Sequence, residues 1–459
     1  MKKKLAYIII SASMLCACSK DFTDLNPISQ RNVNAFYKTE NDMLIAVNAA
    51  YKALQMNGTY NQSYWIMNEM RSDNTDGGAD NTGLGADLNA IDNFNENAAT
   101  AELITTAYLD TYVGISRCNI ILSRIDAVSM SDNLKNRIKG ESLFLRSLFY
   151  YNLAVNFGRI PLVLKEITVE EGKDYPQLPA SEIYKQLVAD LAQAESFLPV
   201  KYTGLDLGRA TKGAAATLMA KIYLTMGDKT SAIAPLRRVK NDYGYTLVTS
   251  YSKIWGIANE NNVESIFEVQ FKGGGTNTGN AFTNAFSPLM IQNTGAYKNR
   301  PTAEMQAAYE TNDQRFAASM NPINGPLNAG RFILKYGTTT AYNEGDADYN
   351  FIVLRYADAL LMLAEALGES QEAYDLIFEV RQRSGLGRID SSTPGTFSEK
   401  LLRERRVELA FENHRWADLL RFGKAAEVMK AQGKTPRLLF LIPQRELDIN
   451  SSYTQNPLN

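Results

Sequence analysis

Aromatic and polar side chains alternate through residues 57–97, a stretch rich in Gly, Asn and Asp. A Tyr or Trp ring can stack on an apolar face of a ligand, while Arg, Asp and Asn side chains donate and accept hydrogen bonds in fixed directions. A polar loop of this length in a helical protein is more often functional than incidental. We therefore expect a binding site here. Its candidate residues are Tyr64, Trp65, Asn68, Arg71, Asp73 and Asn74.

Three tyrosines from a second region extend this candidate site. The helical periodicity weakens across residues 243–350, where Tyr297, Tyr342 and Tyr349 lie in or near loops. We expect Trp65 to be the stacking platform, with Tyr64 as second choice, and the polar residues from Arg71 to Asn74 to form the rim. In the alternative interpretation, Trp65 caps a helical stack and the polar residues only order their own loop.

Catalytic chemistry has little support in the residues. His414 is the single histidine, so neither a His-based triad nor a multi-histidine metal site is expected. Residues 273–275 are three glycines without the Lys-Ser/Thr and helix start of a nucleotide-binding loop. Hydrolysis by paired carboxylates stays open among 50 Asp and Glu residues. We expect no enzyme activity, cofactor or metal; a secreted glycosidase and a ligand-free scaffold are the alternatives.

Residues 1–17 have the features of a secretory signal peptide. Three lysines precede an apolar run over residues 5–15, which is too short to span a bilayer comfortably. Leu15-Cys16-Ala17-Cys18 resembles a bacterial lipobox, in which a cysteine becomes the lipidated first residue. We expect Cys18 to carry the acyl chains, such as palmitate, because each buried CH2 contributes about 0.8 kcal/mol to membrane binding. The mature protein would then be anchored by lipid.

Composition places few limits on the partners. The 459 residues are 45% hydrophobic and 21% charged, enough for one large domain or two fused halves. The net charge is −2, or about −5 without the three signal lysines. No nucleic acid is expected, since binding it requires clustered Lys and Arg. Cys118 lies on an apolar helical face and is interpreted as a core thiol.

A charged segment near the end of the chain has helical periodicity. In residues 404–421, apolar positions recur at helical spacing, and opposite charges lie within helical reach, as in Arg405 with Glu408 and Arg415 with Asp418. Thr396 and Glu399, just upstream, have the spacing of a capping box. Arg binds carboxylates as a planar fork. We predict that these four charged residues are buried, paired and structural.

This segment, ERRVELAFENHRWADLLR, resembles the C-terminal motif of the SusD/RagB-like outer-membrane lipoproteins. Matches to the same family occur at residues 145–163, 354–366, 380–386 and 442–457, in the order that the family has them. Leu441 stands where proline is frequent, and the chain ends in Pro457-Leu458-Asn459 rather than Pro-Gly-Tyr.

The resemblance implies a function in nutrient uptake. Members of the family bind nutrients at the cell surface and act as the lid of a SusC-like TonB-dependent transporter. It implies an oligosaccharide ligand, or a peptide for a RagB-like member, and an outer-membrane location facing the cell exterior. The acidic residues after Cys18 resemble the export signal of such lipoproteins.

The candidate binding residues must be positioned by helices. Apolar stripes and capping signals predict helices through most of the chain, several of them in tetratricopeptide-like pairs. We expect a mainly α, SusD-like fold with stacked helix pairs and a loop-rich, partly β ligand-binding region. The expected halves are residues 18–240, with the long polar loop 57–97, and residues 241–459, with the loop-rich region 243–350. Residues 265–271 alternate as a strand does.

Overall fold

The computed structural model describes residues 36–78, 84–97, 102–289, 291, 295–337 and 345–457. Cys18 and Tyr342 lie outside these ranges. In the part that is described, no helix combines the length and the apolar character needed to cross a bilayer.

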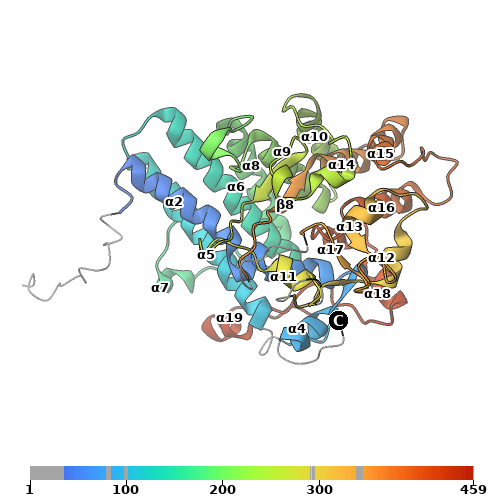
Figure 1. Ribbon diagram of the computed structural model, residues 1–459. Helices are drawn as coiled ribbons and strands as arrows, with labels where there is room; N and C mark the ends of the chain where they lie inside the picture. Colours follow the sequence, from blue (N-terminus) through green and yellow to red (C-terminus); the bar gives the residue numbers. More distant parts are fainter. Residues whose placement is uncertain are drawn as a thin grey trace, which may run out of the picture.

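Eight helices form a continuous stack, which runs from α2 and α5 to α14 and α15 (Figure 1). They are α2 (Glu40–Lys52), α5 (Glu102–Arg124), α6 (Asp132–Phe157), α8 (Ala180–Phe197), α9 (Lys212–Thr225), α10 (Lys229–Asn241), α14 (Tyr356–Leu367) and α15 (Gln371–Arg383). α2 packs on α5, α5 on α6, α6 on α8, α8 on α9 and α9 on α10; α10 then packs on α14, and α14 on α15. The mainly α fold with stacked helix pairs is therefore confirmed.

The other elements lie beside and below this stack (Figure 1). The helices are α3 (Ser63–Trp65), α4 (Leu84–Asp92), α7 (Val169–Gly172), α11 (Phe282–Phe286), α12 (Ala303–Ala308), α13 (Arg315–Ser319), α16 (Phe397–Glu408), α17 (Arg415–Arg421), α18 (Ala425–Ala431) and α19 (Gln444–Ile449). The strands are β1 (Thr75–Asp76), β2 (Ile160–Pro161), β3 (Gln177–Leu178), β4 (Ser265–Val269), β5 (Arg300–Pro301), β6 (Met320–Asn321), β7 (Phe332–Ile333) and β8 (Phe351–Arg355). They pair antiparallel as β1–β5, β2–β3, β4–β8 and β6–β7.

Local signals fix where several helices begin and end. Thr396 and Glu399 form the expected capping box at the start of α16, and Thr39 with Asp42 forms another at the start of α2. Gly158 follows α6 with a φ of 69°, a left-handed conformation that suits glycine at a helix end.

One apolar core runs through the stack. α9 buries residues on all sides, because alanines 214–216 and Ala220 let neighbouring helices approach closely. Strand β8 pairs with β4 and leads directly into α14, so Arg355 at its end enters the interior. The strand expected over residues 265–271 is present as β4.

The segment 57–97 differs from the polar loop that we expected. Residues 57–61 and 66–70 form two short π-helices on either side of α3, followed by β1 and α4. Every side chain from Ser63 to Thr75 is buried. The Gly, Asn and Asp content suggested a loop, but the apolar cluster from Tyr64 to Met67 draws this segment into the core.

Candidate functional site

Trp65 is a core residue and not an exposed platform, so that part of the prediction is wrong. It is 1% exposed, and its ring meets Phe286 of α11 edge to face at 5.0 Å between centroids. Such an arrangement is typical of packed aromatic pairs in protein interiors. Of the alternative interpretation, in which Trp65 caps a helical stack, the structure supports the packed ring, whose aromatic partner is Phe286 of the short helix α11.

The expected polar rim is also buried. The Arg71 guanidinium is fully buried, lies 3.6 Å from the centroid of the Phe440 ring and pairs with Glu96 at 3.0 Å. The Asn74 amide donates to Glu69 Oε1 at 2.8 Å. Both residues order the segment, and neither presents a free face to a ligand.

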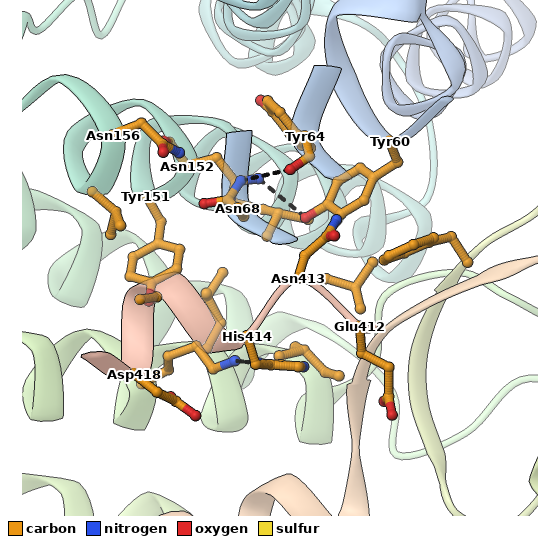
Figure 2. Close-up of a pocket in the computed structure, with 18 of the residues that line it drawn as sticks. Tyr60, Tyr64, Asn68, Tyr151, Asn152, Asn156, Glu412, Asn413, His414 and Asp418 are labelled. Atoms are coloured by element: carbon orange, nitrogen blue, oxygen red, sulfur yellow. Dashed lines mark hydrogen bonds between the residues drawn. The ribbon is translucent and has the colours of Figure 1, made fainter. Parts of the chain in front are cut away.

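Tyr64 and Asn68 line an interior cavity (Figure 2). The Tyr64 hydroxyl bonds with Thr111 Oγ1 at 2.6 Å, and Asn68 Nδ2 donates to the Tyr64 carbonyl at 2.8 Å. The cavity volume is about 50 Å³. That is room for roughly one or two ordered waters, and too little for a sugar ring.

His414 borders the same cavity. Its Nδ1 lies 2.9 Å from Lys221 Nζ, and that ammonium also pairs with Asp358 of α14 at 2.9 Å (Figure 2 shows the first contact). Burial, and next the Lys221 charge, lower the pKa of His414 to about 4. The imidazole is therefore neutral at pH 7, and its Nδ1 accepts a hydrogen bond from the Lys221 ammonium.

The four charged residues of segment 404–421 are buried and paired, as predicted, but with other partners. Arg405 binds Asp418 with Nε at 2.8 Å and Asp358 with Nη2 at 2.8 Å. Glu408 accepts from Arg315, Arg355 and Arg383. Burial alone would raise the pKa of Asp418, but Arg405 and Arg421 lower it to about 2. The expected pairs within one helix are replaced by pairs that join α16 to α14 and α17.

This network also holds the segment that precedes β1. Arg415 of α17 binds Asp73 as a fork, with Nε–Oδ1 at 2.7 Å and Nη2–Oδ2 at 2.9 Å, and Arg406 of α16 binds the same carboxylate at 3.0 Å. The structure thus gives Asp73 a positioning role two residues before β1.

Strand β1 brings the 57–97 segment against the Tyr297 loop. Asp76 pairs with Arg300 across the β1–β5 ladder, and Asp76 Oδ1 lies 2.9 Å from Arg300 Nη2. Asp76 and Arg300 keep 39% and 28% of their side-chain surface exposed. Tyr297 lies partly exposed beside them, with the Arg300 guanidinium 5.4 Å from its ring centroid. A ring, a cation and a carboxylate therefore meet at the surface.

The backbone at Tyr297 is unusual. Its φ is 52°, and Asn299 has a φ of 53°, a left-handed conformation rare for residues other than glycine. The Tyr297 hydroxyl oxygen would lie 2.5 Å from a Cβ on Gly330, whose φ of 76° also favours glycine. Strained backbone of this kind clusters at functional sites.

Tyr349 is partly buried and lies at the base of the 345–350 segment. Its ring packs so closely on Gly337 that a Cβ there would lie 2.1 Å from Tyr349 Cζ. Asn280 Nδ2 donates to the Tyr349 carbonyl at 2.7 Å and thereby holds this segment against α11. Tyr349 therefore contributes to the support of the loops.

A surface hollow of about 930 Å³, which we call the loop-face hollow, opens between α2–α5 and the loops around residues 275–281 and 345–346. Its lining mixes apolar residues such as Met56 and Ala281 with polar and charged side chains: Lys52, Gln55, Asn57, Asn61, Gln62, Asp110, Asn277 and Asp346. Asp110 accepts the Gly58 N–H at 2.8 Å, and Asp346 accepts the Gly275 N–H at 2.8 Å. Asp110 and Asp346 thus bind backbone N–H groups in the walls of the hollow. The Asn and Gln side chains of the lining provide hydrogen-bond donors and acceptors.

Asp76, Arg300 and the hollow were not among the sequence candidates. The run Asp76-Gly77-Gly78 carries a usable signal, because an acidic residue followed by two glycines marks a turn that exposes its carboxylate. Nothing local indicates its partner Arg300, 224 residues away. In the described ranges, no group of three or more His, Cys, Asp and Glu side chains is arranged to hold a metal ion.

Two family models match the chain. The model described as "Starch-binding associating with outer membrane" matches residues 21–224, and the model described as "SusD family" matches residues 304–439. "SusD-like protein P2" of Formosa agariphila is 25% identical over 99% of this chain and 96% of its own length. "SusD-like protein P25" of the same organism is 26% identical over 93% of this chain and 92% of its own length.

Solved structures share the fold. A "Laminarin binding SusD-like protein" is 29% identical, with a TM-score of 0.82 over 92% of this chain and 100% of the other. A surface glycan-binding protein A from Bacteroides thetaiotaomicron, at 23% identity, has a TM-score of 0.80 over 91% of this chain and 100% of the other, which shows a shared architecture.

Proposed function

The chain belongs to the SusD family, and on that premise we propose that it is an outer-membrane lipoprotein that binds a nutrient oligosaccharide. It delivers this ligand to a SusC-like TonB-dependent transporter at the cell surface. Cys18 carries the lipid, and the binding face is directed to the cell exterior. The description of one matching family model, which names the outer membrane, supports this location.

The observation that carries the proposal is the surface group of Tyr297, Arg300 and Asp76. A sugar ring has an apolar CH face that stacks on an aromatic ring and a rim of hydroxyls that bind charged and amide groups. Tyr297 supplies the first kind of contact, and the Arg300–Asp76 pair supplies the second. The loop that follows α11 carries Tyr297, and the loop that precedes α11 lines the loop-face hollow.

The related protein of known structure supports the class of ligand. The laminarin binding SusD-like protein is similar over its whole length, so laminarin is the first glycan to test. A peptide remains the second candidate ligand, because Tyr, Arg and Asn side chains also bind peptides.

Calorimetry with a panel of polysaccharides and peptides tests the proposal. Laminarin, starch, xyloglucan, mannan and inulin cover uncharged glycans, and a tryptic digest of casein covers peptides. We expect one glycan to bind and to be recovered at its original length. Binding of peptides alone, or recovery of shortened glycan, would contradict the proposal.

The transporter is tested separately. Purification in mild detergent from the native membrane should recover a TonB-dependent barrel with this lipoprotein. A preparation that contains the lipoprotein alone at native expression would count against delivery to a transporter, and would leave the glycan-binding result unaffected.

A further inference from the structure

The loop-face hollow continues into two further hollows on the same surface. A hollow of about 300 Å³, the connecting hollow, shares Lys52, Gln55 and Thr278 with it. The connecting hollow in turn shares residues 207–209 and Glu268 with a hollow of about 270 Å³, the tyrosine groove. These shared lining residues place the three hollows side by side, and we call the row from α2 and α5 to α9 and β4 the depression.

Three tyrosines line the far end of this depression. Tyr202, Tyr243 and Tyr245 are each partly exposed in the tyrosine groove. Their hydroxyls are held by the protein: Tyr202 donates to Glu141, Tyr243 donates to Glu195 at 2.5 Å, and Tyr245 bonds with Thr211 Oγ1 at 2.9 Å. With their hydroxyls bonded to the protein, these residues would offer mainly ring carbon to a ligand in the groove.

A glycine seats one of these rings. A Cβ on Gly213 of α9 would lie 2.3 Å from Tyr245 Cε2, so glycine allows the Tyr245 ring to approach the helix this closely. Its position is therefore fixed before any ligand binds, which lowers the ordering cost of a stacking contact.

Most charged groups around the groove already bind partners within the protein. Arg209 pairs with Glu141 at 2.9 Å and with Asp206 at 2.6 Å. The Glu268 carboxylate accepts the Asn350 amide at 3.0 Å and the Asn261 N–H at 2.9 Å. Lys201 is exposed, and in the described part of the chain it pairs with no carboxylate. A sulfated or uronic-acid glycan requires clustered Arg and Lys, so this lining favours an uncharged chain.

Exposed aliphatic side chains border the same depression. Leu207 and Val263 in the tyrosine groove are 50% and 57% exposed, and Leu205 in the connecting hollow is 105% exposed. Apolar edges beside tyrosine rings suit the CH faces of successive sugar units.

We propose that the loop-face hollow, the connecting hollow and the tyrosine groove together bind one long uncharged polysaccharide chain. The Tyr297 group and the loop-face hollow bind the first few sugar units, and the tyrosine groove binds units farther along the chain. This inference rests on the proposed function and adds to it that affinity grows with chain length.

Chain length separates this inference from the proposed function. Calorimetry is carried out with laminaritriose and with the laminarin polymer; if another panel glycan binds instead, its trisaccharide and polymer replace them. Two variants alter the tyrosine groove: Tyr202→Ala removes a ring, and Val263→Arg fills the groove without removing a side-chain hydrogen bond. Val169→Arg, at a 90% exposed position on α7 outside the depression, is the matched control. A thermal melt of each variant confirms folding.

We expect both groove variants to bind the polymer roughly three- to tenfold more weakly, the size of one lost aromatic contact, and to bind the trisaccharide as the wild type does. The control should match the wild type with both ligands. Folded groove variants that bind the polymer as tightly as the wild type does would overturn the inference. An equal loss of affinity for the trisaccharide and the polymer would also overturn it. A groove that docks a protein instead would leave glycan affinity unchanged and so give the first of these results. If the wild type binds no panel glycan, the proposed function fails as well.

Discussion

Asp73 and Arg415 join two segments that lie 342 residues apart, through parallel contacts of 2.7 and 2.9 Å. Both side chains are 7% exposed. Asp73 lies just before β1, which carries Asp76 to its pairing with Arg300. The ionic network of segment 404–421 therefore positions one strand of the candidate site.

Removing either member of this pair should destabilise the protein. Breaking a buried ion pair costs roughly 3–5 kcal/mol, because the remaining charge has lost its partner. In the Arg415→Ala protein Asp73 still pairs with Arg406, so the loss of unfolding free energy should lie at the low end of this range. In the Asp73→Ala protein both arginines lose their carboxylate, so the loss should be larger. Chemical unfolding measures both.

An exposed ion pair provides the control. Arg388 and Asp375 are 42% and 52% exposed, so Arg388→Ala should change the free energy of unfolding by roughly 0.5 kcal/mol or less. If Asp73→Ala changed it no more than this control, the positioning role of Asp73 would be wrong.

Trp65→Ala should lower the free energy of unfolding, because the Trp65 ring packs on Phe286 and is only 1% exposed. Truncating a buried Trp costs roughly 3–5 kcal/mol. Leu205→Ala, at a fully exposed position, is the matched aliphatic control and should leave the urea midpoint unchanged. A Trp65→Ala protein as stable as the wild type would argue that Trp65 is not part of the core.

Stability should fall as the pH is lowered from 6.5 to 4, in part because of His414. Burial and the Lys221 charge lower the pKa of His414 to about 4 from an ordinary 6.5, so between these values the unfolded chain binds more protons than the folded one. The folded state thus gains stability with rising pH across this window, by up to roughly 3 kcal/mol.

His414→Asn isolates this contribution. The Asn side chain can keep an acceptor near Lys221 but does not titrate. We expect its urea-unfolding free energy, measured between pH 4.5 and 7, to vary less steeply with pH than that of the wild type. Parallel pH curves for the two proteins would rule out a neutral His414 as the cause.

Cys18→Ala should leave the protein without lipid. The Leu15-Cys16-Ala17-Cys18 sequence motivates this prediction, and Cys16→Ala is the control that should still be acylated. Metabolic labelling with a palmitate analogue and membrane fractionation are the measurements. Label retained by the Cys18→Ala protein would assign the anchor to another residue.

Local sequence signals predicted the framework well. The capping box of Thr396 and Glu399, the helical stack and the buried state of Arg405 and Asp418 all follow from spacing and charge within a few residues. The ion-pair partners of these charged residues could not be predicted from spacing, because an arginine side chain reaches other helices as easily as its own helix.

The site was predicted less well, for a physical reason. Composition suggested that Trp65 and Arg71 were exposed, but burial is decided by distant elements: Phe286 covers Trp65, and Phe440 covers Arg71. Tyr297 remained a candidate because its surroundings leave it partly exposed. Its neighbours Asp76 and Arg300 meet only through the β1–β5 pairing, which one sequence does not reveal.

The most direct test of the account is the affinity of Tyr297→Ala and Arg300→Ala for the panel glycan that the wild type binds. Both side chains are partly exposed, so the melting temperatures should stay close to that of the wild type. Tyr223→Ala and Arg388→Ala, at other partly exposed positions, are the matched controls. Loss of a central contact costs about 2 kcal/mol, which at about 1.4 kcal/mol per decade is more than tenfold in Kd. We predict this loss for both site variants in calorimetry; unchanged Kd values in folded site variants would contradict the proposed site.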